Sequence, residues 1–225
     1  MFETAKINQE SFDLIKGWTR YNRPEVEPDH QVERYAWLKD SADLRRILSI
    51  GCGEAKVEEY FFIDLQGNVD HNYPIYGIDI NPLFIKLASE RWPCGVFSHN
   101  DISNNNILLT DDSFSTIILG DVIEHIHPAF FHKVLSEAIR VCAPGGHILI
   151  TFPNGSYFGD NNSSSIYSSD HSFVVTEQVA MDLLMPPDKN WWVRDGKAKH
   201  NFSYNFDIKI SKSKRFLFVD ITPIK

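Results

Sequence analysis

Residues 47–57, ILSIGCGEAKV, decide the fold. Their apolar run ends in Gly51-Cys52-Gly53, and Ala55 follows two residues later. A short apolar run that breaks at glycine is consistent with a buried strand turning tightly into a helix. Glycine also tolerates unusual φ angles and lets a ligand approach the backbone. The turn alone has two interpretations, a strand-to-helix turn that merely suits glycine or a turn that holds a nucleotide-like ligand.

Short β-rich runs alternate with helical stretches around this turn. The expected strands cover residues 45–50, 75–80, 95–101, 114–121 and 145–152. The expected helices cover residues 29–38, 56–65, 82–92, 128–142 and 176–185. Strands that read as continuous apolar runs between helices indicate a parallel sheet covered on both faces. Because residues 201–211 and 214–224 read as an antiparallel hairpin, we predict an α/β fold with a doubly wound, mostly parallel seven-stranded sheet and a C-terminal antiparallel hairpin.

The charge balance bears on the class of partner. The chain has 22 Lys and Arg against 30 Asp and Glu, which gives a net charge of −8. Proteins that grip a nucleic-acid backbone usually carry a basic surplus. A nucleic-acid partner is therefore not expected.

The three cysteines, Cys52, Cys94 and Cys142, lie in or beside apolar segments without metal-like spacing. Buried, reduced thiols in the cytosol explain them. No apolar run approaches the roughly 18 residues of a membrane helix, and residues 1–13 are acidic and polar, unlike a secretion signal. We expect a cytoplasmic protein without a membrane partner, and the sequence does not predict its oligomeric state.

Aspartates end three successive strands, at Asp79, Asp101 and Asp121. Core packing does not explain this series, because carboxylates are seldom buried without partners. A carboxylate at the position of Asp79 can bind both ribose hydroxyls of an adenosine. The alternative for Asp79 is a helix N-cap, since Asn81-Pro82 follows. The series favours a ligand site at the carboxyl ends of the strands.

Five segments together resemble the class I S-adenosylmethionine-dependent methyltransferases: ILSIGCGEA, IYGIDINP, SHNDI, DDSFSTIILGDVIEHIHP and VCAPGGHILITFPN. The resemblance covers roughly residues 45–175. Its most specific part is DDSF…VIEH followed by R-V-x-x-P-G-G. It implies a Rossmann-like methyltransferase fold and S-adenosylmethionine as the cofactor.

The resemblance also implies which residues bind the cofactor. The implied residues are Ser49, Gly51, Cys52, Gly53, Asp79, Ile80, Asp101, Ile102, Leu119, Gly120 and Asp121. In this family the glycine turn lies against the methionine part, the Asp79 position holds the ribose, and the Asp101 position accepts from the adenine amino group. Side chains at the positions of Ile80 and Ile102 sandwich the ring, and residues 119–121 flank the methyl sulfonium.

Within the family, the closest likeness is to small-molecule O-methyltransferases of glycan and quinone biosynthesis. DHQVERYAWL (29–38) is similar to a His-x-x-Arg-Tyr helix that precedes the first strand there, and PNGSYF…DHSFVVT resembles a substrate-side loop. The favoured acceptor is a sugar or nucleotide-sugar. The implied acceptor-side residues are His30, Arg34, Tyr35, His127, Asn154, Tyr157 and Arg194.

The chain then reads as a single methyltransferase domain, residues 1–225. Its expected parts are an N-terminal helical lid (1–40), a cofactor-binding core (41–155), a substrate-side insert (156–205) and the terminal hairpin (206–225).

Methyl transfer to a hydroxyl needs a group that removes the hydroxyl proton, and imidazole suits this near neutral pH. His171 is the first candidate because it follows the fifth strand on the acceptor side. Asp121 is the second and His125 the third. The alternative for His125 is a packed, hydrogen-bonded histidine inside the fold.

Two other functions use the same sequence features. Asp121, Glu124, His125 and His171 form a set similar to that of metal-dependent enzymes that methylate the terminal 2′-hydroxyl of small RNAs, although no resident metal is expected in the leading interpretation. A non-catalytic cofactor-binding or partner-binding module is the other. Its basis is that Ser49 and Ala55 replace an acid and a glycine that are usual in the family.

Overall fold

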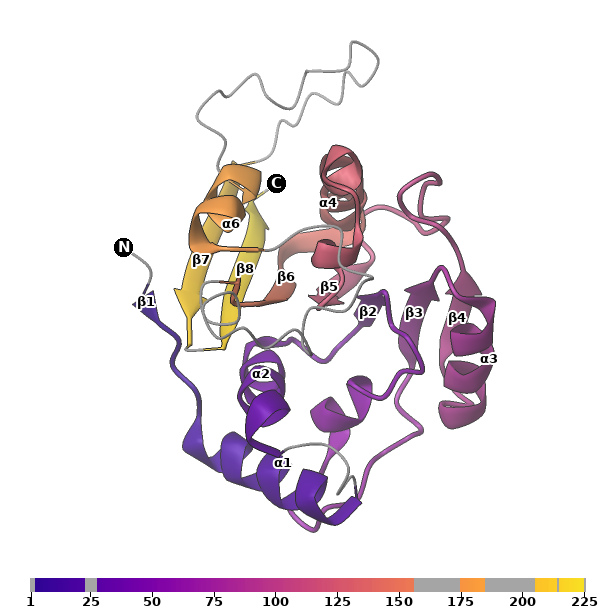
Figure 1. Ribbon diagram of the computed structural model, residues 1–225. Helices are drawn as coiled ribbons and strands as arrows, with labels where there is room; N and C mark the ends of the chain where they lie inside the picture. Colours follow the sequence, from indigo (N-terminus) through magenta and orange to yellow (C-terminus); the bar gives the residue numbers. More distant parts are fainter. Residues whose placement is uncertain (1–2, 23–27, 156–174, 185–204, 214, 225) are drawn as a thin grey trace.

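The computed structural model describes residues 3–22, 28–155, 175–184, 205–213 and 215–224 (Figure 1). The strands are β1 (Glu3–Thr4), β2 (Ile47–Ile50), β3 (Ile75–Asp79), β4 (Val96–His99), β5 (Phe114–Gly120), β6 (Cys142–Pro153), β7 (Asn205–Lys212) and β8 (Phe216–Ile224). The α-helices are α1 (Gln9–Asn22), α2 (Pro28–Ser41), α3 (Pro82–Arg91), α4 (Phe131–Val141) and α6 (Glu177–Leu184). Short 3₁₀ helices are η1 (Glu58–Phe62), η2 (Ile123–His125) and η3 (Pro128–Phe130).

These strands form one sheet in the order β1-β7-β8-β6-β5-β2-β3-β4. Neighbours from β6 to β4 are parallel, whereas β8 runs antiparallel to both β6 and β7. The predicted mostly parallel seven-stranded sheet with a terminal hairpin is thus confirmed. The two-residue strand β1 adds to it by pairing with β7.

Helices cover both faces of the sheet, as the doubly wound prediction requires (Figure 1). On one face, α4 and α6 pack against apolar side chains of β2, β5, β6 and β8. On the other face, α1, α2 and η1 pack against the alternate residues of these strands. Trp92, which ends α3, is fully buried against Ile75 of β3. Alternate strand residues therefore enter different cores, which fixes the register of the sheet.

The helix predicted for residues 128–142 forms as α4, in which Phe131, Val134 and Ala138 are fully buried. The helix predicted for residues 56–65 is wrong, because only the short 3₁₀ helix η1 forms there. Four consecutive residues of η1 are buried, and its aromatic residues are weak helix formers. One face of an α-helix cannot bury four consecutive residues.

In the part of the chain that the structure describes, no helix has the length and apolarity needed to cross a bilayer.

A histidine–aspartate pair joins the neighbouring strands β6 and β8. His147 of β6 and Asp220 of β8 approach to 3.0 Å between Nδ1 and Oδ1. This hydrogen bond raises the pKa of His147 above its ordinary value, against the opposing effect of partial burial.

We expect the melting temperature to fall as pH rises through the folded-state pKa of His147. A raised folded pKa means that the stabilisation is complete below the unfolded pKa of about 6.5 and is lost above the folded value. Calorimetric melting of the parent and of His147→Gln between pH 5.5 and 8.5 tests this. The difference in melting temperature between the two should shrink with rising pH, and a constant difference would contradict the expectation.

Candidate functional site

A cavity of about 670 Å³ opens where the strand order reverses, beyond the carboxyl ends of β2, β3, β4 and β5. Open α/β sheets bind ligands at such switch points. The cavity brings together nine of the residues singled out in the sequence, namely Gly51, Gly53, Asp79, Ile80, Asp101, Ile102, Asp121, His125 and His127.

Left-handed backbone shapes the glycine turn after β2. Gly51 and Gly53 have φ angles of +69° and +54°. The Gly51 amide donates to the Ile78 carbonyl of β3 at 2.7 Å. A Cβ at Gly51 would lie 2.5 Å from Cγ2 of Val122, so glycine is required there for two reasons.

Ala55, which stands in place of a glycine, keeps the left-handed conformation with φ +54°. Left-handed backbone costs a residue other than glycine roughly 1–2 kcal/mol. Ala55 is fully buried, and its carbonyl accepts from Nε1 of Trp92 at 3.0 Å. The turn is therefore retained with alanine.

Asp79 links the glycine turn to the end of β3. Its Oδ2 accepts from the Gly53 amide at 2.9 Å, and its Oδ1 accepts from the Asn81 amide at 2.8 Å. The N-cap of α3 is Asn81, whose Oδ1 accepts from the Leu83 amide. The N-cap alternative for Asp79 is thus wrong, and each carboxylate oxygen retains acceptor capacity toward the cavity.

At the far side of the cavity, Asp101 is held as an acceptor. Its Oδ1 accepts from the Ser103 amide at 3.0 Å and its Oδ2 from Nδ2 of Asn104 at 2.5 Å. Partial burial opposes ionisation, but these hydrogen bonds lower the pKa of Asp101 below its ordinary value. Ile102 is buried nearby, whereas Ile80 is 63% exposed.

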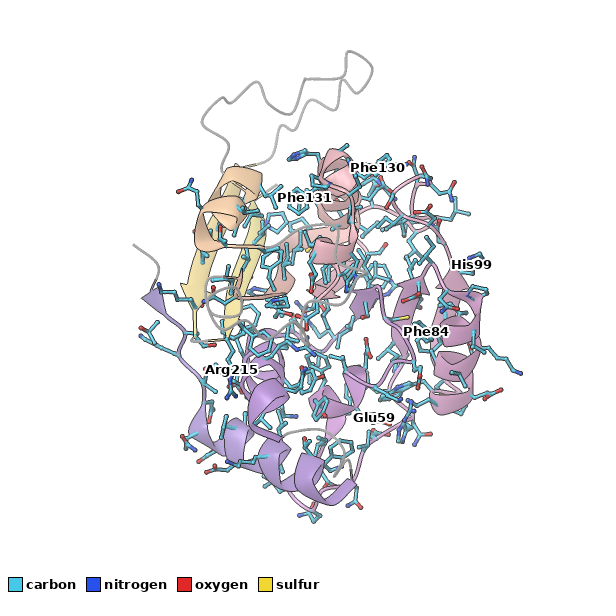
Figure 2. The ribbon with its side chains drawn as sticks, viewed as in Figure 1. Glu59, Phe84, His99, Phe130, Phe131 and Arg215 are labelled. Atoms are coloured by element: carbon cyan, nitrogen blue, oxygen red, sulfur yellow. The ribbon has the colours of Figure 1, made fainter. Side chains whose placement is uncertain are left out.

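Two aromatic side chains add to the cavity walls. Phe84 of α3 and Phe130 of η3, both labelled in Figure 2, line the cavity while keeping 36% and 39% of their surface exposed. Together with Ile80 they offer apolar surface, which suits a flat ring. No sequence pattern singled out either phenylalanine.

Asp121 has the left-handed conformation, with φ +53°. Its Oδ1 accepts from Oγ1 of Thr151 at 3.1 Å, and its Oδ2 forms an ion pair with Nη1 of Arg34 in α2. Arg34 also donates from Nη2 to Oη of Tyr35 at 2.7 Å, and the Tyr35 ring stacks on Tyr60 of η1. The helix before the first parallel strand therefore reaches the cavity wall through Arg34.

Glu124 is the residue whose importance the sequence did not reveal. It is 2% exposed, and neither carboxyl oxygen has a hydrogen-bond partner in the described part of the chain. Burial raises the pKa of Glu124 to about 7, although its own backbone amide and, less strongly, the Arg34 guanidinium act in the opposite direction. The sequence signal for Glu124 was an acid three residues after Asp121, and it entered only the metal-dependent alternative.

His125 and His127 both expose their rings at the cavity. The interpretation of His125 as a histidine packed inside the fold is therefore wrong. Nδ1 of His127 accepts from the Ala129 amide at 3.2 Å and caps η3. Both rings lie on the segment that follows β5, the fourth expected strand, whereas the acceptor was expected beyond the fifth expected strand, which is β6.

Other predicted residues do not line this cavity or lie outside the described residues. Ser49, Cys52 and Leu119 are buried, Gly120 is half-buried, and none of these four lines the cavity. Tyr35 and Asn154 are buried and also lie outside its lining. The remaining positions outside the described residues are Tyr157, His171 and Arg194, together with the side chain of His30.

The metal-dependent alternative depends on Asp121, Glu124, His125 and His171. Within the described residues, no group of three or more candidate side chains is placed to hold a metal ion. A guanidinium rather than a metal ligand set engages Asp121.

Comparison with known families identifies the core. A profile of the family described as "Methyltransferase domain" matches residues 48–150. This core is a class I S-adenosylmethionine-dependent methyltransferase domain. The family, enzyme class and cofactor predicted from the sequence are confirmed.

Two curated relatives of this chain have different substrates in their names. A tRNA N(3)-cytidine methyltransferase METTL2 of Gallus gallus is 27% identical over 149 residues, which are 63% of this chain and 39% of the relative. A phthiotriol/phenolphthiotriol dimycocerosates methyltransferase of Mycobacterium leprae is 31% identical over 106 residues, 46% of this chain and 36% of the relative. The chain thus spans less than two fifths of the length of these relatives.

Among solved structures, the N-methyltransferase NodS from Bradyrhizobium japonicum, in complex with S-adenosylhomocysteine, has the same fold. The match has a TM-score of 0.54 and 16% identity, and it covers 96% of this chain and 98% of that one. The cavity of this methyltransferase domain fits the cofactor chemically. Asp79 and Asp101 offer acceptor oxygens, and the apolar walls offer surface for an adenine ring.

Proposed function

We propose that this methyltransferase acts on a hydroxyl group of a small polar acceptor, with a sugar or nucleotide-sugar as the favoured class. The observation that carries the proposal is the placement of two exposed imidazoles, His125 and His127, in the same cavity as Asp79 and Asp121. Imidazole can take up a hydroxyl proton near neutral pH.

In the proposed reaction, some residues of this chain orient the cofactor and another removes the proton. Bound S-adenosylmethionine supplies a methyl group already activated by its sulfonium. In the proposal, Asp79 and Asp101 orient the nucleoside part, and an imidazole removes the proton while the acceptor oxygen bonds to the methyl carbon. Alignment of reactants can be worth ~7–11 kcal/mol and a base ~10²–10⁴-fold.

The N-terminal lid remains part of the proposal. Its support is the ion pair between Arg34 of α2 and Asp121 on the cavity wall. Because this pair engages Arg34, Arg194 is the better candidate for an anionic group on a nucleotide-sugar.

The test of the proposed base compares His125→Asn with His71→Asn. His71 lies outside this cavity, where it approaches Glu59 at 3.3 Å. We expect His125→Asn to lower kcat about 100-fold with unchanged affinity for S-adenosylhomocysteine, because removal of a base affects the transfer step alone. His71→Asn should keep kcat within twofold. An unchanged kcat in His125→Asn would move the base to His127 or His171.

The assay measures S-adenosylhomocysteine formed with sugars, nucleotide-sugars, and small RNA with and without added Mg²⁺ or Mn²⁺. The relatives' names point to a tRNA cytidine and to phthiotriol dimycocerosates, so tRNA and a lipid alcohol complete the panel. Metal-stimulated turnover on small RNA would replace the proposal by the metal-dependent alternative. Cofactor binding without turnover on any acceptor would favour the non-catalytic module.

A further inference from the structure

Three buried polar atoms beside the cavity lack hydrogen-bond partners within the described residues. They are Nε of Arg34 and both carboxyl oxygens of Glu124. The two residues are only 5% and 2% exposed. Native proteins rarely leave such atoms unsatisfied, and the exceptions often mark functional sites.

Arg34 pairs with one carboxyl group and acts electrostatically on a second. Its Nη1 is engaged by Asp121, which lines the cavity. The same guanidinium is the positive charge that acts on Glu124, which is buried and does not line the cavity. The unused N–H of Arg34 and the unused oxygens of Glu124 are chemically complementary.

We expect the cofactor to compete with Arg34 for the Asp121 carboxylate. S-adenosylmethionine carries a sulfonium and an ammonium, and its methyl-bearing end is expected beside residues 119–121. In a partly buried site, these cations attract the Asp121 carboxylate and repel the Arg34 guanidinium. Arg34 then needs a second anionic partner.

We propose that Glu124 is a positioning residue that receives the Arg34 guanidinium when the cationic end of S-adenosylmethionine approaches Asp121. This inference rests on the proposed placement of the cofactor in the cavity. Tyr35 of α2, which accepts from Nη2 of Arg34, serves as the pivot. Glu124 thereby sets cofactor affinity without touching the cofactor.

The first test is a double-mutant cycle with Glu124→Gln and Arg34→Gln, read by calorimetric titration. Glutamine is nearly isosteric with glutamate but cannot offer the guanidinium a full charge. We expect Glu124→Gln to weaken S-adenosylmethionine about tenfold, and S-adenosylhomocysteine less because it lacks the sulfonium. In the Arg34→Gln background the change of Glu124 to Gln should have no effect, since the guanidinium that competes with the cofactor for Asp121 is gone.

The matched control is Glu59→Gln. Glu59, labelled in Figure 2, is also a buried glutamate, and unlike Glu124 it already pairs with an arginine, at 2.7 Å from Nη1 of Arg91, outside this cavity. Glu59→Gln should leave cofactor affinity within twofold of the parent. An equal loss from Glu124→Gln with and without Arg34 would reduce Glu124 to a structural residue and overturn the inference.

A second measurement needs no Arg34→Gln protein. In ¹⁵N spectra of arginine side chains, S-adenosylmethionine should shift the Arg34 Nε resonance of the parent, and the shift should vanish in Glu124→Gln. Cofactor binding without a shift in the parent overturns the inference while leaving the proposed function intact. Absence of cofactor binding overturns both.

Discussion

Alanine at Gly51 will abolish measurable binding of S-adenosylhomocysteine, whereas alanine at Gly53 will weaken binding only about tenfold. Both positions need left-handed backbone, which costs alanine roughly 1–2 kcal/mol. Only at Gly51 does the new Cβ also collide with a neighbour, at 2.5 Å from Cγ2 of Val122. Overpacking of this kind costs about 1–3 kcal/mol more, so the expected loss at Gly51 exceeds ~100-fold.

Calorimetric titration of both variants checks the difference, with melting curves to show that each is folded. Nothing lies within 4 Å of a Cβ at Gly53, so that variant isolates the backbone cost. A second change, Val122→Ala, removes both Cγ atoms that would collide and should restore part of the binding to Gly51→Ala. Equal losses at the two glycines would mean that backbone strain alone governs the turn.

The arrangement of the cavity followed from the sequence because its parts lie at strand ends. Parallel strands place their carboxyl ends at one edge of the sheet, so Gly51, Asp79, Asp101 and Asp121 could be expected together from their positions alone. The glycines themselves indicated a tight turn after β2. The contacts that hold this turn, from the Gly51 amide to Ile78 and from the Gly53 amide to Asp79, join segments that are distant in the chain.

Features that depend on packing between distant segments escaped sequence analysis. Arg34 and Asp121 are 87 positions apart, and nothing in either segment indicates their ion pair. The buried, unpartnered state of Glu124 depends on what packs around η2, and the exposure of His125 follows from the same packing. The helix expected at residues 56–65 failed for this reason too, since tertiary burial of four consecutive residues overrode the local pattern.

The loop between Asp101 and β5 depends on a single arginine of α4. Arg140 donates from its two Nη atoms to the carbonyls of Leu109 and Ile107, at 2.9 and 2.8 Å, and to Asp111 at 2.6 Å. It also bonds both oxygens of Glu137, which in turn accepts from the Ile107 amide at 2.7 Å. These contacts tie the loop that follows Asp101 to the core.

We expect Arg140→Ala to lower the free energy of unfolding by about 3 kcal/mol. A hydrogen bond to a charged group contributes about 1.5–3 kcal/mol net of solvent exchange, and Glu137 would be left buried without its charged partner. Urea unfolding measures the change. Arg45→Ala is the control, because Arg45 pairs with Asp43 while 83% exposed, and exposed pairs contribute little.

The same variant separates stability from cofactor binding. If the Arg140 contacts hold Asp101 in place through the loop, folded Arg140→Ala should bind S-adenosylhomocysteine several-fold more weakly, with the loss confined to the adenosine end. Adenosine is the fragment that reports this end, so its affinity should fall in parallel. Arg140→Lys keeps one charge but not the planar fork that bonds two carbonyls and two carboxylates at once, so it should recover only part of either quantity. Parent-like affinity in folded Arg140→Ala would show that Ser103 and Asn104 alone position Asp101.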